Sequence, residues 1–241
     1  MAMKTRLLTR ILTAFSLILA ANSNAQELVG GWEGGPSNGY AFAAPIFSFP
    51  KSSEGSAWVL RPAASYLYYE TRDVTGVTDV RSPGASLGVA WRWRSPQLTA
   101  SIGPGYESRW ERRTLPSGAV INQTKTGATV AADVYWQAAP LTRVTWSGSY
   151  GDSDQYYWSR VGLARQLATV DANNKTALSV GADVTVQGNP DIARQQAGGL
   201  LEVNFLKARS SLQLRAGYSQ SRNAGQNESQ PYFALGFYVE W

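Results

Sequence analysis

The stretch ALSVGADVTVQ, Ala177 to Gln187, alternates apolar and polar positions from end to end. The residues between the apolar positions are small, polar or charged, and the apolar set comprises Leu178, Val180, Ala182, Val184 and Val186. Successive side chains of a β-strand point to opposite faces, so a period of two over this length indicates a strand with one apolar face.

The same period recurs along the chain after residue 25. TGATVAADVYWQ (Thr126 to Gln137), SLQLRAGYSQ (Ser211 to Gln220) and SLGVAWRWR (Ser86 to Arg94) each have an apolar face and a polar face. We predict about twelve strands, at residues 28–34, 38–49, 57–70, 81–95, 97–110, 123–138, 141–151, 155–169, 175–187, 193–206, 209–223 and 229–241.

The predicted links between strands alternate in length. Even-numbered strands are followed by short links, such as Pro96 and Ala139–Pro140, whereas several odd-numbered strands are followed by longer polar segments. These segments include TRDVTGVTDV (Thr71 to Val80), RRTLPSGAVINQ (Arg112 to Gln123), QGNPDIA and NAGQNES. Their Gly, Pro, Asn and Asp residues indicate loops. Short links at one rim and long loops at the other are typical of an up-and-down barrel in a membrane.

Two all-β architectures fit this pattern. A soluble barrel or sandwich turns its apolar faces inward, whereas a membrane barrel turns them towards lipid. Small soluble barrels already fill their interior at about eight strands. Here the face opposite the apolar one carries small residues and charges of both signs, and Tyr and Trp gather near strand ends. We therefore expect an all-β, up-and-down antiparallel transmembrane β-barrel of about 12 strands, located in the outer membrane.

The first 25 residues have the features of a cleaved signal peptide. Lys4, Arg6 and Arg10 precede a short apolar run and the small-residue site Ser23–Ala25. We therefore divide the chain into a signal peptide at 1–25 and an outer-membrane β-barrel at 26–241. Cleavage lowers Lys plus Arg from 22 to 19 against 17 acidic residues, so the net charge falls from +5 to +2. The basic balance is then weak evidence for nucleic-acid binding, and no nucleic-acid partner is expected.

The chain ends on FALGFYVEW, an alternating stripe formed by Phe233, Leu235, Phe237, Val239 and Trp241. This stripe resembles the last strand of outer-membrane barrels, which typically ends on an aromatic residue. Such a strand is similar to the signal that the barrel-assembly machinery reads. Trp241 stands where Phe is commoner. The resemblance implies that the barrel-assembly machinery is a partner.

Enzymatic chemistry has little support in the composition. The chain contains no His and no Cys, so the commonest ligands of transition metals and the commonest general base are missing. Gly148-Ser149-Tyr150-Gly151 is out of register with a GxSxG nucleophile elbow. We expect no catalytic residue, no metal site and no cofactor.

The polar faces of the predicted strands supply the candidate lumen residues. They are Arg92, Arg94, Glu107, Arg109, Asp133, Asp183, Glu202 and Arg215. A glycoside hydrolase needs two facing carboxylates. Because arginines balance the acids here, we interpret the set as structural ion pairs instead.

Two segments are predicted at the outer rim, RWERR (Arg109 to Arg113) and DSDQYYW (Asp152 to Trp158). Exposed aromatics stack on sugar rings, and the candidate outer-loop aromatics are Trp110, Tyr156, Tyr157 and Trp158. The arginines of RWERR suit the phosphates of lipopolysaccharide. An aromatic girdle with a solvated loop is the simpler interpretation of DSDQYYW, with calcium binding by Asp152 and Asp154 as the alternative.

Three segments together carry a family resemblance. SIGPGYESR (Ser101 to Arg109), TWSGSYGDSDQYYWSRVGL (Thr145 to Leu163) and GADVTVQGNPDIARQQAGGLLEV (Gly181 to Val203) resemble the cellulose biosynthesis protein BcsS family. The resemblance covers most of the chain after residue 25. It implies an exported barrel associated with bacterial cellulose operons, and the family brings no agreed catalytic residues to carry over.

The resemblance leaves two physical roles open, a lumen that passes a glucan or an anchor whose outer loops contact the polymer. A glucan path needs a run of lumen aromatics, and the predicted inner face has few beyond Tyr135, Tyr232 and Tyr238. We therefore expect a non-enzymatic accessory of cellulose biosynthesis or export, with a small porin or solute channel as the alternative. Expected partners are outer-membrane lipid, lipopolysaccharide, and cellulose or components of the cellulose-synthase complex.

Overall fold

The computed structural model describes residues 26–49, 54–73, 76–169, 176–190, 192–223 and 226–241. The predicted signal peptide, residues 1–25, lies outside the described residues. Within the described part, no helix is long and apolar enough to cross a membrane.

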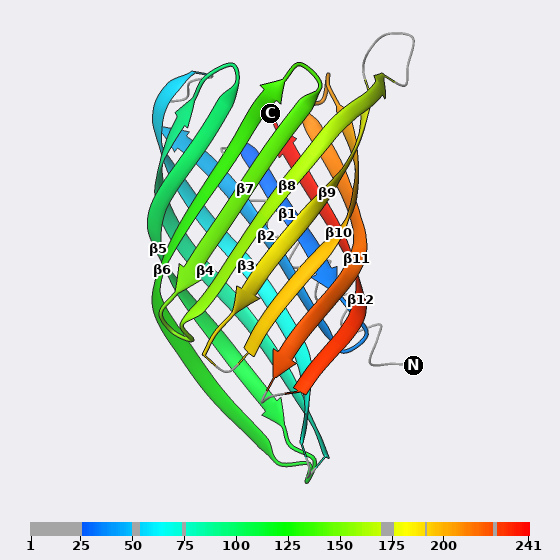
Figure 1. The fold of residues 1–241 in the computed structure, drawn as a ribbon. Helices are drawn as coiled ribbons and strands as arrows, with labels where there is room; N and C mark the ends of the chain where they lie inside the picture. The colour runs from blue at the N-terminus through cyan, green and yellow to red at the C-terminus, as the bar shows by residue number, and fades with distance from the viewer. Residues whose placement is uncertain (1–25, 50–53, 74–75, 170–175, 191, 224–225) are drawn as a thin grey trace.

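The described residues form twelve strands that close into one antiparallel barrel, in which each strand pairs with its neighbours in sequence and β1 pairs with β12 (Figure 1). The strands are β1 Glu27–Gly34, β2 Asn38–Phe49, β3 Gly55–Asp73, β4 Gly76–Arg94, β5 Leu98–Thr114, β6 Val120–Ala139, β7 Thr142–Gly151, β8 Tyr156–Thr169, β9 Thr176–Gly188, β10 Ile192–Phe205, β11 Ser210–Asn223 and β12 Gln226–Glu240. The predicted fold class and strand number are confirmed.

The barrel closes where the first strand meets the last. The β1–β12 register runs from Glu27 opposite Glu240 to Gly34 opposite Phe233. The N–H of Trp241 donates to the carbonyl of Gln26 at 3.1 Å, which continues the ladder beyond β12. The start of β1 and the end of β12 therefore share one rim, which we call the termini rim, and we call the opposite one the hairpin rim.

The hairpin rim differs from the prediction of long polar loops. TRDVTGVTDV and RRTLPSGAVINQ belong largely to strands, because β3 pairs with β4 as far as Asp73 opposite Gly76, and β5 pairs with β6 as far as Thr114 opposite Val120. Most of QGNPDIA and NAGQNES is likewise strand. The prediction was wrong because the parts of strands that extend beyond the apolar belt face water on both sides. Their residues are therefore polar on both faces, and their composition is similar to that of a loop.

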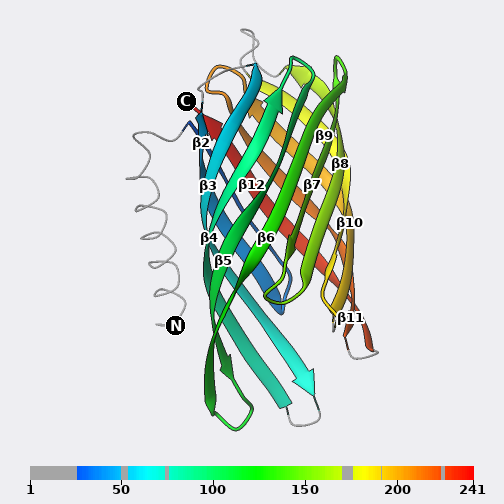
Figure 2. The same ribbon diagram turned by 90° about the vertical axis from the view of Figure 1, so that its left-hand side faces the viewer.

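Two hairpins consequently project past their neighbours at this rim, as Figure 2 shows for β3–β4 and β5–β6. β2 pairs with β3 only up to Tyr69, and β7 pairs with β6 only from Thr129 onwards. We call residues 70–73, 76–79 and 110–124 the overhang.

The outer surface of the barrel is apolar, with aromatic residues towards both rims. Trp58, Trp91, Trp93 and Trp136 lie near the termini-rim ends of their strands, and all four are exposed. Trp58 and Trp91 face each other on β3 and β4 with ring centroids 5.0 Å apart. Tyr150 and Tyr157 are a directly opposite, exposed pair at the hairpin-rim ends of β7 and β8. This placement matches the interfacial girdles of membrane barrels.

The inside is mostly polar but contains one apolar cluster. Ile46, Val59 and Ala90 from β2, β3 and β4 pack together with Val29 of β1. Ala43, Ala44 and Ile46 are all buried, which explains why the alternation of β2 is unclear in the sequence.

Candidate functional site

Strand alternation places all eight candidate lumen residues on the inner face of the barrel. Arg92 and Arg94 project inward from β4 while Trp91 and Trp93 project outward and are exposed. Each of the four candidate carboxylates contacts an arginine, so the inner face is organised as ion pairs. They bridge strands at several levels, from the termini rim to the hairpin rim.

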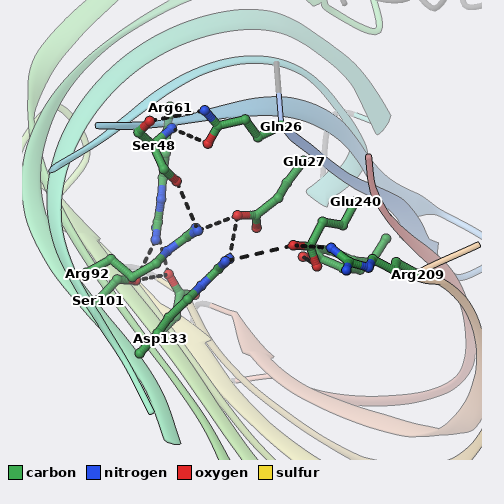
Figure 3. A network of polar contacts seen from close by, with 11 residues as sticks. Gln26, Glu27, Ser48, Arg61, Arg92, Ser101, Asp133, Arg209 and Glu240 are labelled. Atoms are coloured by element: carbon green, nitrogen blue, oxygen red, sulfur yellow. Dashed lines mark hydrogen bonds and ion pairs between the residues drawn. The ribbon is translucent and has the colours of Figure 1, made fainter. Parts of the chain in front are cut away.

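The first level lies at the termini rim, around Glu27. One oxygen of this carboxylate accepts hydrogen bonds from Arg92 and from Arg94, the latter at 2.5 Å (Figure 3). Arg94 also lies 3.9 Å from Glu240, which in turn lies 3.7 Å from Arg209. The network joins β1, β4 and β12 across the inside of the barrel. It also pairs the opposite charges of Glu27 and Arg92, both of which are almost completely buried. Nε of Arg92 has no hydrogen-bond partner among the described residues.

A second pair links β3 to β6. Arg61 donates to Asp133 at 2.7 Å and to the hydroxyl of Ser101 at 2.5 Å (Figure 3). The side chain of Asp133 keeps 46% of its surface accessible even though it faces inward. Water therefore reaches this part of the lumen.

A third pair links β7 to β10. Arg143 donates to both oxygens of Glu202, and Gln213 donates to the same carboxylate at 2.5 Å. The guanidinium of Arg143 also lies 5.3 Å from the centre of the Tyr135 ring. The side chain of Glu202 is only 1% exposed, so its charge depends on these partners.

Asp183 organises the middle of the barrel. Its carboxylate lies 3.6 Å from both Arg160 and Arg215 and accepts a hydrogen bond from Tyr232 at 3.0 Å. Arg160 also forms an ion pair with Glu33. β8 and β1, which supply these two residues, lie five places apart in the ring of strands, so the pair crosses the lumen.

The last candidates lie closer to the hairpin rim. Glu107 accepts from Arg109 at 3.1 Å and from Ser153 at 3.0 Å, which ties β5 to the β7–β8 turn. Further out, Glu111 and Asp154 both contact Lys125. Near the same level, Arg194 donates to Asn38 at 2.9 Å, and so connects β10 with β2. These contacts connect strands across the half of the lumen that lies towards the hairpin rim.

The two sides of the lumen differ in their access to solvent. Many inward side chains of β9 to β12 are buried, including Asp183, Glu202, Ser219 and Tyr232. On β6 and β7, by contrast, Asp133, Tyr135 and Ser149 face inward and keep solvent contact. Packed polar groups thus occupy one side, and a hydrated strip runs along the other.

The four candidate outer-loop aromatics do not form one loop surface. The link between β7 and β8 is only four residues, so Tyr156, Tyr157 and Trp158 are the first residues of β8. Tyr157 points outward, whereas Tyr156 donates to Gln187 inside the barrel at 2.8 Å and Trp158 packs 5.1 Å from the guanidinium of Arg160. Trp110 lies on the outward face of β5 and is exposed. The assignment to a loop was wrong because the turn after β7 ends at Gln155 and β8 already begins at Tyr156.

The inner face is richer in aromatic residues than the sequence indicated. Tyr40 and Phe42 of β2 stack at 5.9 Å on the inner face, and Tyr69 of β3 faces inward opposite Asn38. With Tyr156 and Trp158, they add to the predicted Tyr135, Tyr232 and Tyr238. Aromatic residues suit both faces of a membrane strand, so their type alone does not show which way they point. The alternation of inward and outward positions along β2, β3 and β8 identifies these as inward.

The C-terminal stripe lies on the lipid-facing side of β12. Phe233 and Leu235 are exposed, and Trp241 directly follows the strand and is exposed at the termini rim. Phe237 covers Gly30 of β1, where an added Cβ would meet its ring at 2.5 Å. The last strand therefore both closes the barrel and supplies part of its apolar surface.

Among the described residues, no group of three or more acidic side chains is arranged to hold a metal ion.

Comparison with known protein families identifies the family to which this barrel belongs. The model of the cellulose biosynthesis protein BcsS family matches residues 20–240. The chain belongs to this family. The match covers every described strand, so the resemblance noted in three segments extends through the whole barrel of this BcsS-family protein. No curated protein matches the chain.

Solved structures agree on the fold of the BcsS-family chain. The β domain of the Bordetella autotransporter BrkA aligns with a TM-score of 0.54 at 11% identity, over 91% of this chain and 100% of that one. LpxR from Salmonella typhimurium aligns with a TM-score of 0.53 at 10% identity, over 89% and 100%. At such identities the likeness concerns the outer-membrane barrel fold alone.

Proposed function

We propose that this BcsS-family barrel is a non-enzymatic outer-membrane accessory of cellulose biosynthesis or export, and that it acts through its hairpin rim. The observation that carries the proposal is the ion pair between Arg160 and Glu33 across the lumen. Together with the Asp183 cluster, this pair occupies the middle of the barrel with fixed side chains. We therefore do not propose that a polymer passes through the lumen. We propose instead that the projecting hairpins are the surface through which the barrel acts.

The proposal places the hairpin rim outside the cell. Membrane barrels of this class carry their longer connections on the extracellular side and short turns on the periplasmic side. Among the described residues the overhang projects furthest beyond its neighbouring strands, and the start of β1 and the end of β12 lie at the other rim. The chain has no Cys, so Ser117→Cys at the β5–β6 turn introduces a single label site. Labelling of intact cells by a membrane-impermeant maleimide supports this orientation, and labelling only after lysis contradicts it.

The non-enzymatic part of the proposal is supported by the state of the carboxylates. Glu107 and Asp133 are each hydrogen-bonded to an arginine, and each glycosidase carboxylate must instead face a substrate bond. Glu107→Gln and Asp133→Asn are therefore expected to complement a deletion strain. Loss of cellulose with either folded variant would move the proposal to a barrel enzyme.

The decisive experiment is deletion of the gene followed by complementation. Cellulose is measured by dye binding, and the amount of folded barrel by the mobility shift on boiling before electrophoresis. We expect altered cellulose in the deletion strain and recovery with the wild-type chain. Unchanged cellulose in the deletion strain would remove the proposed role.

One observation favours the second candidate, a small solute channel. The inward strip on β6 and β7 keeps solvent contact at Asp133 and Ser149. If the strip is continuous, the purified barrel conducts ions in planar bilayers without any substitution. A closed wild-type barrel supports the accessory, and a conducting barrel with unchanged cellulose in the deletion strain supports the channel.

A further inference from the structure

The lipid-facing side of β5 changes character along its length. Starting near the termini rim, its outward side chains include Ile102, then Tyr106, then Trp110, and finally Arg112, and all four are exposed. The order runs from aliphatic through amphipathic to cationic. A bilayer changes in the same order, from acyl chains through the interface to charged headgroups.

Arg112 has a second arginine beside it. In the β4–β5 register it lies directly opposite Arg81, and Tyr68 of β3 lies opposite Arg81 in turn. The inward neighbours Ser82 and Glu111 are buried, which fixes both arginines on the outward face. Like charges directly opposite each other on a sheet repel, so this arrangement needs a counter-charge.

The described residues supply only part of that counter-charge. Asp79 accepts from Nε and Nη2 of Arg81 at 3.0 and 3.1 Å, and this pair is partly exposed. Asp79 lies two residues closer to the hairpin tip than Arg81, opposite Glu70. Asp79 and Glu70 thus both lie on the side of Arg81 that is further from the apolar belt. Arg112 forms no ion pair with the described residues.

We propose that Arg81 and Arg112, with Trp110 below them, bind a phosphorylated sugar of lipopolysaccharide in the outer leaflet. An arginine pair suits phosphate oxygens because guanidinium groups donate in a fixed fork. The exposed indole of Trp110 is two residues, about 7 Å, nearer the membrane, where it can stack on a sugar ring. The proposal rests on the orientation given above, in which the hairpin rim lies outside.

The test is binding of deep-rough lipopolysaccharide to the purified barrel in detergent, counted by native mass spectrometry. The double variant Arg81→Ala/Arg112→Ala is expected to bind about tenfold more weakly, because it loses charge-assisted hydrogen bonds. Arg222→Ala is the matched control, an exposed arginine near the same rim on β11 whose cross-strand neighbours are Ala193 and Asn227. It should bind like the wild type. Arg112→Lys keeps the charge but loses the guanidinium fork, so its affinity should lie between those of the wild type and the double variant.

Two further arms identify the ligand. Dephosphorylated lipid A tests the phosphate, and phosphatidylglycerol tests for a general anionic lipid. Selective loss with dephosphorylated lipid A, and weak binding of phosphatidylglycerol, support the site. Equal binding by wild type and double variant, or equal binding of phosphatidylglycerol, overturns it. Because the assay uses purified protein, it is independent of the maleimide test of orientation and of any cellulose phenotype.

Discussion

Arg160 on β8 forms an ion pair with Glu33 on β1, although these strands lie five places apart around the barrel. The other ion pairs inside the described barrel join strands at most four places apart, as Arg61 on β3 joins Asp133 on β6, three places away. The Arg160–Glu33 pair therefore acts as a strut across the lumen. Asp183, on the neighbouring strand β9, also contacts the guanidinium of Arg160 and helps to hold it in position.

Removing this strut should open the barrel. Arg160→Ala deletes the cross-lumen contact and leaves Glu33 without its cation, so we expect measurable ion conductance and a stability loss of about 3 kcal/mol. Conductance is read in planar bilayers from protein that still shows the boiling-dependent mobility shift. Arg165→Ala, an exposed outward arginine of the same strand, is the control. Wild-type conductance in folded Arg160→Ala protein would show that other side chains close the lumen.

The Arg143–Glu202 pair should contribute strongly to stability. Glu202→Gln keeps the shape but removes the charge that three donor groups share, and it leaves Arg143 as an uncompensated buried cation. Breaking one partner of such a pair costs about 3–5 kcal/mol. Urea unfolding in detergent should show this loss. Replacing both partners, as in Arg143→Met/Glu202→Leu, should cost less than the single change, and a larger cost for the double variant contradicts the argument.

Sequence alternation predicted the barrel well where lipid touches one face. Val180, Val184 and Val186 are exposed on the outside while Asp183 and Thr185 between them are buried inside, as the period of two requires. The same reasoning failed beyond the apolar belt. Glu111 points in and Arg112 points out there, so both faces of β5 are polar and the strand resembled a loop.

The sequence predicted which residues face the lumen better than it predicted which of them contact each other. That Arg160 faces inward follows from its position on β8, but its contact with Glu33 depends on the stagger of twelve strands around the barrel. The same alternation places Tyr156, four residues before Arg160, inward and Tyr157 outward, once β8 is known to begin at Tyr156. The stagger of the strands, which the local sequence pattern leaves open, decides the contact between Arg160 and Glu33.

The last strand allows a direct test of the lipid-facing surface. Phe237→Lys places a charge on the outward face of β12 and removes the ring that covers Gly30. The expected cost is about 2–4 kcal/mol at the middle of the membrane, with reduced assembly into the outer membrane. Gln220→Lys, on the outward face of β11 near the hairpin rim, should cost at most about 1 kcal/mol. Normal assembly of Phe237→Lys would mean that the lipid-facing side is assigned wrongly.

The overhang provides the sharpest test of the proposed accessory role. Arg112 and Asn122 lie directly opposite each other on β5 and β6, so residues 113–121 can be replaced by Asn-Gly, which favours a two-residue hairpin turn. The barrel below should fold unchanged, because residues 129–139 of β6 keep their pairing with β7. We expect this variant to reach the outer membrane but fail to restore cellulose in the deletion strain.

A matched variant separates the length of the overhang from the sequence of its turn. Replacing residues 115–119 by five Gly and Ser residues keeps β5 and β6 at full length and should restore cellulose, because the turn alone is altered. Both variants retain Arg81 and Arg112, so lipopolysaccharide binding should be unaffected in either. Full recovery of cellulose by the shortened hairpin would exclude the β5–β6 overhang as the functional surface and leave β3–β4, or the lumen, to carry the role.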